Sequence, residues 1–137
     1  MRLYLGLGFS GLALLALAPP AAAETPADFL DIFAAQARQA DAAFQAFSAE
    51  RGRQFFLDRH GSEWSCANCH TDNPTGTGRH AKTGKTIRPL APAKNPDRFT
   101  STAKVAKWFR RNCNDVLARE CTPREKGDVL TWLLGIK

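Results

Sequence analysis

Residues 65–70 read SCANCH, a stretch in which Cys66 and Cys69 stand three positions apart and His70 follows directly. On one helical turn this spacing carries two thiols to the two vinyl groups of a porphyrin, and the adjacent imidazole reaches the iron. The stretch therefore predicts one haem c, bound covalently through Cys66 and Cys69, with His70 as the proximal iron ligand.

Two other kinds of site also use paired cysteines, and the rest of the sequence argues against both. A thioredoxin-like redox pair stands in a βαβ setting, which this sequence lacks. A zinc site of four thiolates would need Cys113 and Cys121 as its second pair, but seven residues separate them. A thiol–disulfide protein without haem stays open as an alternative.

The first residues have the pattern of an export signal. Arg2 gives a positive start, residues 3–18 contain no charge, and Ala21-Ala22-Ala23 has the small side chains of a cleavage site. We expect cleavage after Ala23, which makes residues 1–23 a signal peptide and residues 24–137 a single domain in the periplasm. Retention of the apolar run as a membrane anchor is less favoured, because the run is short for a span.

The charge of the chain is strongly positive and unevenly distributed. Its 137 residues include 19 Lys and Arg against 13 Asp and Glu, a net charge of +6. Residues 79–111 hold ten of the basic side chains and a single acid, Asp97. Such a region is either a solvated basic face or a surface that steers an acidic partner. Binding of nucleic acid is not expected for an exported chain without a recognised motif.

Helical patterns dominate the sequence after the signal. Apolar residues recur at spacings of three and four from a capped start at Thr25, which predicts helix as far as His60 with a break at residues 50–52. Residues 71–99 are aperiodic and rich in Gly and Pro, which predicts a long loop against the haem edge. A helix over residues 101–112 and another from Thr122-Pro123 complete an all-α domain of about four to five helices, without strands.

The core of this domain is expected to form where the early and late helices meet. Gly52 and Phe56 share one helix face and are expected to meet Trp132, with glycine permitting a close approach. The last helix is expected to turn four apolar side chains toward the core: Val129, Leu130, Leu133 and Leu134.

The residue on the far side of the iron is not decided by the sequence pattern. Methionine, which fills this position in many small cytochromes, occurs only as Met1. The candidates are His60, His80, a lysine that would have to lose its proton, an asparagine such as Asn112 or Asn114, or no ligand.

The cysteines beyond the attachment motif bear on the same question. Export places them where disulfides persist, and a bridge between Cys113 and Cys121 would contribute about 2.5 kcal/mol by chain entropy. Such a bridge either stabilises the fold in the ordinary way or fixes the wall of the haem site beside Asn112.

Four stretches together resemble the sphaeroides haem protein family of small, high-spin class I cytochromes c. They are AERGRQFFL (49–57), SCANCH (65–70), TGKTIRPLAPAKNPDRFT (83–100) and KWFRRNCNDVLARECTPREKGDVLTWL (107–133). The resemblance spans roughly residues 49–135 and implies a class I cytochrome c fold around the covalent haem. It also implies that Asn112 is the distal ligand of the ferric iron and that Cys113 and Cys121 form a disulfide.

The resemblance implies a function as well. Members of the family bind dioxygen and nitric oxide when reduced, and they exchange electrons with a dihaem cytochrome c and a membrane cytochrome b. Trp108 and Phe109 are expected to line the haem pocket, and Arg88 or Arg98 to hold a haem propionate.

The chemistry of an amide ligand agrees with such a function. A neutral amide oxygen suits ferric iron better than ferrous iron, so reduction should release Asn112 and open the haem to diatomic ligands. The sequence thus indicates a redox-gated electron-transfer protein that binds dioxygen or nitric oxide, and whether it also reduces them stays open. The alternative is a simple electron carrier with a permanent sixth ligand.

Overall fold

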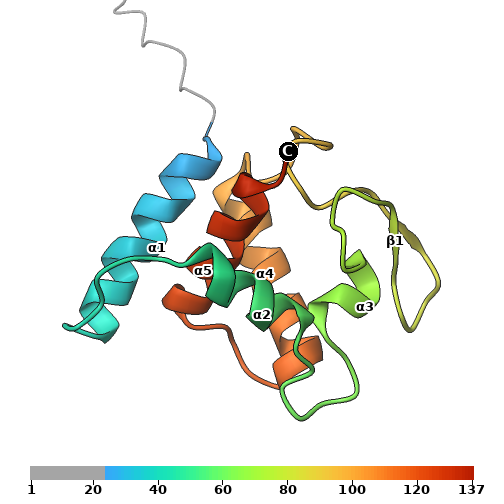
Figure 1. Ribbon diagram of the computed structural model, residues 1–137, viewed down its shortest axis with the longest axis horizontal. Helices are drawn as coiled ribbons and strands as arrows, with labels where there is room; N and C mark the ends of the chain where they lie inside the picture. Colours follow the sequence, from blue (N-terminus) through green and yellow to red (C-terminus); the bar gives the residue numbers. More distant parts are fainter. Residues whose placement is uncertain (1–23) are drawn as a thin grey trace, which may run out of the picture.

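The structure is a computed structural model that describes residues 24–137, so the expected signal peptide lies outside the described part of the chain. The elements follow in the order α1 (Pro26–Ala40), α2 (Ala49–Leu57), α3 (Cys66–His70), β1 (Gly78–Arg79), β2 (Thr86–Ile87), α4 (Thr102–Leu117) and α5 (Pro123–Gly135). Figure 1 shows α1 at one side of α5 and the segment from α3 through β1 at the other. The prediction of a helical domain with four to five helices is confirmed. None of the helices described has the length and apolar character needed to cross a membrane.

The crossing of α2 and α5 forms the centre of the fold (Figure 1). Phe56 of α2 is 1% exposed and packs on Val129, and its ring centroid lies 5.0 Å from that of Trp132. Gly52 marks the closest approach, because a Cβ at this position would lie 2.0 Å from the carbonyl oxygen of Asp128. The predicted contact of Phe56 with Trp132 is confirmed, whereas Gly52 meets the backbone of α5 at Asp128 rather than Trp132.

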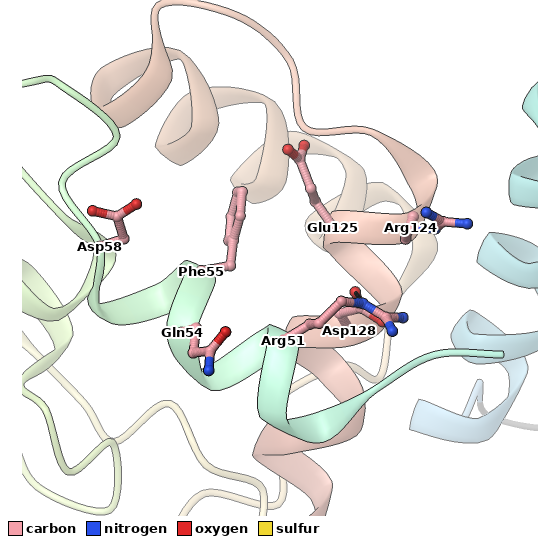
Figure 2. A pocket seen from close by; sticks show the side chains of 7 residues that line it. All are labelled: Arg51, Gln54, Phe55, Asp58, Arg124, Glu125 and Asp128. Carbon is pink, nitrogen blue, oxygen red and sulfur yellow. Dashed lines mark hydrogen bonds and ion pairs between the residues drawn. The ribbon is translucent and has the colours of Figure 1, made fainter.

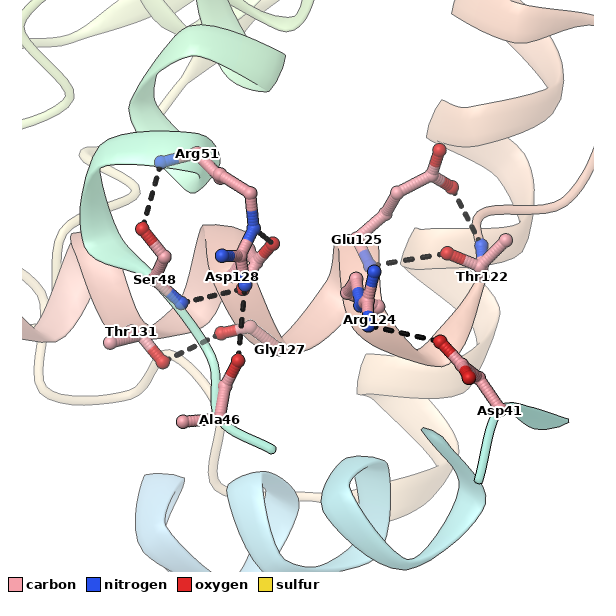
Figure 3. A network of polar contacts seen from close by, with 10 residues as sticks. All are labelled: Asp41, Ala46, Ser48, Arg51, Thr122, Arg124, Glu125, Gly127, Asp128 and Thr131. Atoms are coloured by element: carbon pink, nitrogen blue, oxygen red, sulfur yellow. Dashed lines mark hydrogen bonds and ion pairs between the residues drawn. The ribbon is translucent and has the colours of Figure 1, made fainter. Parts of the chain in front are cut away.

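An ion pair between the half-exposed Arg51 and the buried Asp128 fixes the start of α2 against α5, as Figure 3 shows. Asp128, 4% exposed, accepts hydrogen bonds from Nε of Arg51 at 2.8 Å and from a terminal guanidinium nitrogen at 2.9 Å. The same carboxylate accepts the backbone N–H of Ser48 at 2.6 Å, and Arg51 also donates to the carbonyl of Ala46 at 3.0 Å. Because the Asp128 carboxylate is buried and both of its oxygens are occupied, the loss of Arg51 would leave a buried negative charge without its ionic partner.

The break between the first two helices lies elsewhere than predicted. Residues 50–52 are inside α2, and the interruption falls at residues 41–48. Asp41 turns the chain after α1, because its Oδ1 accepts the backbone N–H of Ala43 at 2.9 Å. Ser48 then begins α2 as its N-cap, accepting an N–H from the first turn at 3.2 Å.

Two phenylalanines explain why the helical period misled the prediction. Phe44 and Phe47 continue the apolar spacing of α1, but both lie in the connecting segment with their ring centroids 5.0 Å apart. Phe47 occupies the space beside Gly127 of α5, where a Cβ would lie 2.1 Å from its ring. Tertiary packing against α5 therefore overrides the local pattern at this point.

Helix α4 is longer than predicted. The sequence predicted its end at residue 112 and a turn from Cys113 onward, but α4 continues to Leu117. Ala118 ends the helix in the left-handed conformation, with φ of 54°. Cys113 therefore belongs to α4 rather than to the turn that follows.

The starts of the first and last helices agree with the sequence. Thr25 with Asp28 and Thr122 with Glu125 both form the reciprocal hydrogen bonds of a capping box. Three of the four apolar side chains predicted to be buried in α5 are buried, but Leu134 is 37% exposed and the prediction for it is wrong. Its place one position after Leu133 turns it away from the crossing with α2.

The segment predicted as a loop contains two short antiparallel strands, β1 and β2, which pair Gly78 with Ile87. The prediction that no strand occurs is therefore wrong, and strands of two residues are too short to show alternation in the sequence. Elsewhere the segment is held by its backbone: the carbonyl of Pro74 accepts the N–H groups of Leu90 and Ala91 at 2.9 and 3.0 Å.

Replacing Gly52 by Ala is expected to destabilise the domain, because the new methyl group overlaps the Asp128 carbonyl and pushes α2 from α5. Such overpacking costs on the order of 1–3 kcal/mol. Urea unfolding of the haem-loaded protein, followed by circular dichroism, measures the loss. Gly135→Ala is the matched control for helix propensity alone, since nothing lies within 4 Å of a Cβ there. Equal midpoints for Gly52→Ala and the unmodified protein would contradict the close approach.

Candidate haem site

Helix α3 is a single turn that presents the attachment motif on the surface of the α2–α5 crossing. Asn68 Oδ1 accepts the backbone N–H of Ser65 at 2.7 Å and its hydroxyl at 3.0 Å, which fixes the start of the turn. Cys66 and Ala67 pack against the buried cluster around Phe56. The crossing therefore sets the orientation of the turn that carries both thiols.

The two cysteines of the motif are free thiols and half-buried. Burial raises the pKa of the Cys66 thiol to about 12, so it is neutral at neutral pH. The sulfur of Cys69 accepts the backbone N–H of Ala81 at 3.3 Å. Two thiols that are held on one turn without bridging each other are what covalent attachment to a porphyrin requires.

His70 has the properties of a metal ligand. Its Nδ1 is buried without a hydrogen-bond partner, and it is the one such side-chain atom within residues 24–137. Burial lowers the pKa of His70 to about 4, with smaller effects from Arg98 and His80, so the imidazole is neutral at neutral pH. Buried polar atoms normally have a partner, and a neutral imidazole is the form that binds a metal. The residues present therefore fit a haem iron.

The described chain has no competing metal centre. Within residues 24–137, no three His, Cys, Asp or Glu side chains gather closely enough to hold a metal ion. A bridge joins Cys113 to Cys121, as predicted, so these two sulfurs are not available to a zinc site of four thiolates. The structure therefore does not form the zinc site of four thiolates that the sequence left to be weighed.

A small cavity of about 30 Å³ links the attachment turn to α4. Trp64 and Cys69 line it on one side, and Asp115 and Val116 of α4 on the other. Lys82, from the segment between β1 and β2, lies 3.9 Å from the Asp115 carboxylate across this cavity. One thiol of the motif thus lies next to the helix that carries the proposed distal ligand.

Asn112 lies on the inward face of α4. It follows Phe109 by three positions and precedes Val116 by four, which puts the three side chains on one side of the helix. The Asn112 side chain is half-buried, and none of the hydrogen bonds found within residues 24–137 uses its amide. An amide oxygen without a protein partner is free to act as a ligand, and this role stays a prediction.

The two aromatic residues predicted to line the haem pocket have different surroundings. Phe109 meets Phe33 of α1 edge to face, with ring centroids 5.7 Å apart, and belongs to the core. Trp108 is 47% exposed, with the amine of Lys107 and the guanidinium of Arg111 over its ring at 5.5 and 5.3 Å. Trp108 lies one turn before Asn112 with much of its ring uncovered by the chain, so it is the better placed of the two.

The other candidate axial ligands are placed less well. His60 has a partner for each ring nitrogen: Nε2 donates to the carbonyl of Phe55 at 2.8 Å, and Nδ1 lies 3.6 Å from Asp58. His80 accepts the N–H of Thr83 on Nδ1 at 3.3 Å and lines the small cavity. The geometry argues against His60 and leaves one nitrogen of His80 unused.

The two arginines proposed for a propionate also differ. Arg98 donates to the carbonyls of Pro89 and Arg88 at 3.0 and 2.7 Å, and it is close enough to His70 to lower the pKa of that imidazole. Arg88 instead pairs with Asp97 at 3.4 Å. Arg98 is therefore the more suitable residue to meet a charged group of the haem.

The bridge between Cys113 and Cys121 joins α4 to the turn before α5. In the same turn Arg119 donates to both carboxylate oxygens of Glu125 at 2.9 and 2.7 Å, and Glu125 accepts the N–H of Thr122 at 2.7 Å. Burial acts to raise the pKa of Glu125, but these hydrogen bonds outweigh it and hold the pKa below its ordinary value. The end of α4 that follows Asn112 is thus fixed covalently and electrostatically.

A larger cavity, of about 440 Å³, lies apart from the attachment motif, between α2 and α5 (Figure 2). Arg51, Arg124, Glu125 and Asp128 are among its lining residues. Each of these four charges already has a partner of opposite charge in the protein. The cavity is therefore a groove between paired charges, and no residue of the haem site lines it.

Comparison with known sequences finds relatives among c-type cytochromes. Residues 42–133 match a family described as a domain of unknown function (DUF1924). Cytochrome c-type protein SHP of Cereibacter sphaeroides is 51% identical over 89 residues, which are 62% of this chain and 68% of that protein. Cytochrome c'' of Methylophilus methylotrophus is 41% identical over 102 residues, which are 72% of this chain and 71% of that protein.

Solved structures agree with the predicted fold. The crystal structure of oxidised cytochrome c'' from Methylophilus methylotrophus superposes with a TM-score of 0.72 at 36% identity, covering 82% of this chain and 94% of that one. The structure of oxidised SHP, described as an oxygen-binding cytochrome c, superposes with a TM-score of 0.71 at 44% identity, covering 80% and 96%. The predicted cytochrome c fold is confirmed.

Replacing both Cys66 and Cys69 by Ser is expected to make the haem extractable, because no thioether bond can then form. Extraction with acidified acetone followed by haem staining of a denaturing gel measures the bond: the unmodified chain keeps its stain and the variant loses it. Cys113→Ser/Cys121→Ser is the matched control and should stain like the unmodified chain. Stain that stays on the Cys66→Ser/Cys69→Ser chain would rule out attachment through these sulfurs.

Replacing Cys113 and Cys121 by Ser is expected to lower the free energy of unfolding by about 2.5 kcal/mol, because the bridge closes a short loop in the unfolded chain. Urea unfolding of the oxidised, haem-loaded protein measures the loss. The ferric spectrum of the same variant is expected to change, since Asn112 directly precedes Cys113. A loss of stability with an unchanged ferric spectrum would make the bridge an ordinary stabilising disulfide.

Proposed function

Because the chain belongs to the family of c-type cytochromes that includes SHP and cytochrome c'', and accordingly binds haem c covalently, we propose that it is a periplasmic redox protein with a gated sixth ligand. In this proposal its haem opens to dioxygen or nitric oxide when it is reduced. The observation that carries the proposal is the Asn112 amide, half-buried on the inward face of α4 without a hydrogen bond.

The chain offers two very different donors that would hold a haem iron. When bound, the haem supplies an iron that changes its charge by one electron and takes a ligand on each side. His70 offers a neutral imidazole from α3. Asn112 offers an amide oxygen from α4, and the only methionine of the chain, Met1, lies in the expected signal peptide. A strong ligand on one side and a weak one on the other is the arrangement that lets one side open.

The weakness of the amide provides the gate. An uncharged oxygen donor holds ferric iron better than the softer ferrous iron, so the Asn112 side chain would bind in the oxidised protein and would withdraw in the reduced one. Its N–H group is then available to donate a hydrogen bond to a diatomic molecule that enters. Two descriptions of relatives support this: SHP is called an oxygen-binding cytochrome c, and the solution structure of cytochrome c'' is said to give insight into haem-ligand detachment.

The partners and the location follow from the family resemblance and the signal pattern. We propose that residues 1–23 direct export and that residues 24–137 work in the periplasm, where electrons come from a dihaem cytochrome c or a membrane cytochrome b. The competing function is a simple electron carrier with a permanent sixth ligand, and the unused ring nitrogen of His80 makes it the residue to consider.

Asn112→Ala is expected to remove the sixth ligand of the ferric protein and leave it five-coordinate or water-bound, while the ferrous protein still binds carbon monoxide. Loss of the amide N–H should also speed dissociation of dioxygen by up to about tenfold, the equivalent of one hydrogen bond. Visible spectra of both oxidation states, and laser photolysis of the gas complexes, measure the two effects.

The matched control for this substitution is Asn114→Ala, an exposed asparagine two positions further along α4. It should leave the spectra and the gas kinetics unchanged. A ferric spectrum of Asn112→Ala identical to that of the unmodified protein would remove Asn112 from this role. A low-spin ferrous spectrum of the unmodified protein that ignores carbon monoxide would favour the simple carrier.

A further inference from the structure

The outer face of α4 gathers positive charge that the protein does not neutralise. The one acid of α4, Asp115, is paired with Lys82. Glu24, which precedes α1 in the chain, accepts hydrogen bonds from Thr102 at the start of α4 and pairs with no cation in the described part of the chain. Four exposed basic residues of this helix take part in none of the ion pairs found within residues 24–137, and they form what we call the α4 basic face: Lys104, Lys107, Arg110 and Arg111.

The spacing of these residues is unfavourable for the isolated domain. Lys104, Lys107 and Arg111 are three and four positions apart, so they stand one above the other along the helix. Like charges at this spacing repel one another and weaken a helix. A row of cations that costs stability and has no internal partner is suited to an external anionic partner.

The chain also holds two of these cations in place. The amine of Lys107 and the guanidinium of Arg111 lie over the exposed ring of Trp108, at 5.5 and 5.3 Å from its centroid. Such cation–π contacts restrain long side chains, so less entropy is lost when a partner binds them. Trp108 lies one helical turn before Asn112, so the restrained cations border the haem site.

We propose that the α4 basic face is the docking surface for an acidic electron-transfer protein. The proposal rests on the proposed function, because it assumes that this chain exchanges electrons with another protein. Positive charge at this face speeds the encounter with an acidic surface and orients it. A partner bound there would contact the helix that carries Asn112, close to the proposed site of the haem iron that receives the electron.

An anionic membrane is the competing occupant, and α4 suits it less well. A helix that binds a membrane surface buries a whole apolar face in the lipid. Val105 and Val116 of α4 are buried in the domain, and Phe109 is half-buried against its core. Trp108 is the one large apolar side chain of α4 that is exposed, and a single ring provides little area for insertion.

The test follows electron transfer from fully reduced flavodoxin, an acidic flavin protein, to the ferric haem of the exported, haem-loaded protein by stopped flow. Each event takes one electron from the flavin hydroquinone, which becomes the semiquinone, and reduces one ferric iron to ferrous. Lys107→Glu/Arg111→Glu is expected to lower the bimolecular rate constant about tenfold or more at low ionic strength, and to flatten its dependence on salt.

Two matched variants separate the surface from net charge. Arg38→Glu/Arg53→Glu makes the same change of net charge at exposed positions of α1 and α2, and should change the rate constant less than about twofold. Lys107→Arg/Arg111→Lys keeps both charges and should keep the rate. The proposed docking surface would be overturned if both charge reversals lowered the rate constant equally, or if Lys107→Glu/Arg111→Glu did not lower it.

Three further measurements assign the cause. Reduction by neutral lumiflavin semiquinone should be equally fast in all variants, and an equal slowing in the α4 variant would place the defect in the haem site and overturn the proposal. If the protein binds phosphatidylglycerol vesicles, Lys107→Glu/Arg111→Glu abolishes that binding and its rate with flavodoxin is unchanged, the face binds a membrane and the proposed protein docking surface is overturned.

Carbon monoxide binding tests the proposed function separately. If the ferrous protein does not bind carbon monoxide while Lys107→Glu/Arg111→Glu still slows reduction by flavodoxin, only the gated ligand site is contradicted.

Discussion

The contact between α2 and α5 is the constraint from which the position of the attachment site follows. Only a residue without Cβ at position 52 lets the backbone of α5 approach at Asp128, and the ion pair of Asp128 with Arg51 fixes the register. Phe56 then closes the crossing, and the turn that begins with Cys66 packs on it. Since α3 has only five residues, it cannot hold its own conformation and takes its place from this crossing.

The opposite side of the site is held by a separate set of bonds. The attachment turn packs on α2 and β1, whereas α4 is tied to α1 through Phe109 and to the start of α5 through the bridge at Cys113. The proposed proximal imidazole and the proposed distal amide are therefore positioned by different contacts within the fold. A haem bound to the first and liganded by Asn112 would couple them in the oxidised state and uncouple them on reduction.

Sequence reasoning succeeded where chemistry is local. The spacing of Cys66, Cys69 and His70 and the capping pairs of α1 and α5 depend on neighbours within one turn, so the sequence alone specified them. It failed where a residue distant in the sequence determines the local conformation. Phe47 has the spacing of a helical residue but lies in the segment between α1 and α2, because its ring fills the space at Gly127, eighty positions away. The two-residue strands lacked any periodic signal, whereas Cys113 and Val116 do continue the apolar spacing of Val105 and Phe109 to the end of α4. Asn112 was one of several candidates until a family resemblance singled it out, because an unused amide leaves no mark in the sequence.

The rigidity of α4 determines how a ligand such as Asn112 can let go. Phe109 is locked against α1 on one side and Cys113 is bridged on the other, so the backbone at position 112 has little freedom to move. In the proposed gate, detachment of Asn112 would then occur by rotation of the side chain between rotamers, which is far faster than the movement of a packed helix. No hydrogen bond found within residues 24–137 holds the Asn112 amide, so in the proposed gate the strength of its bond to the iron would set the balance. A weak donor on a fixed helix would thus give a gate that responds to oxidation state without any rearrangement of the fold.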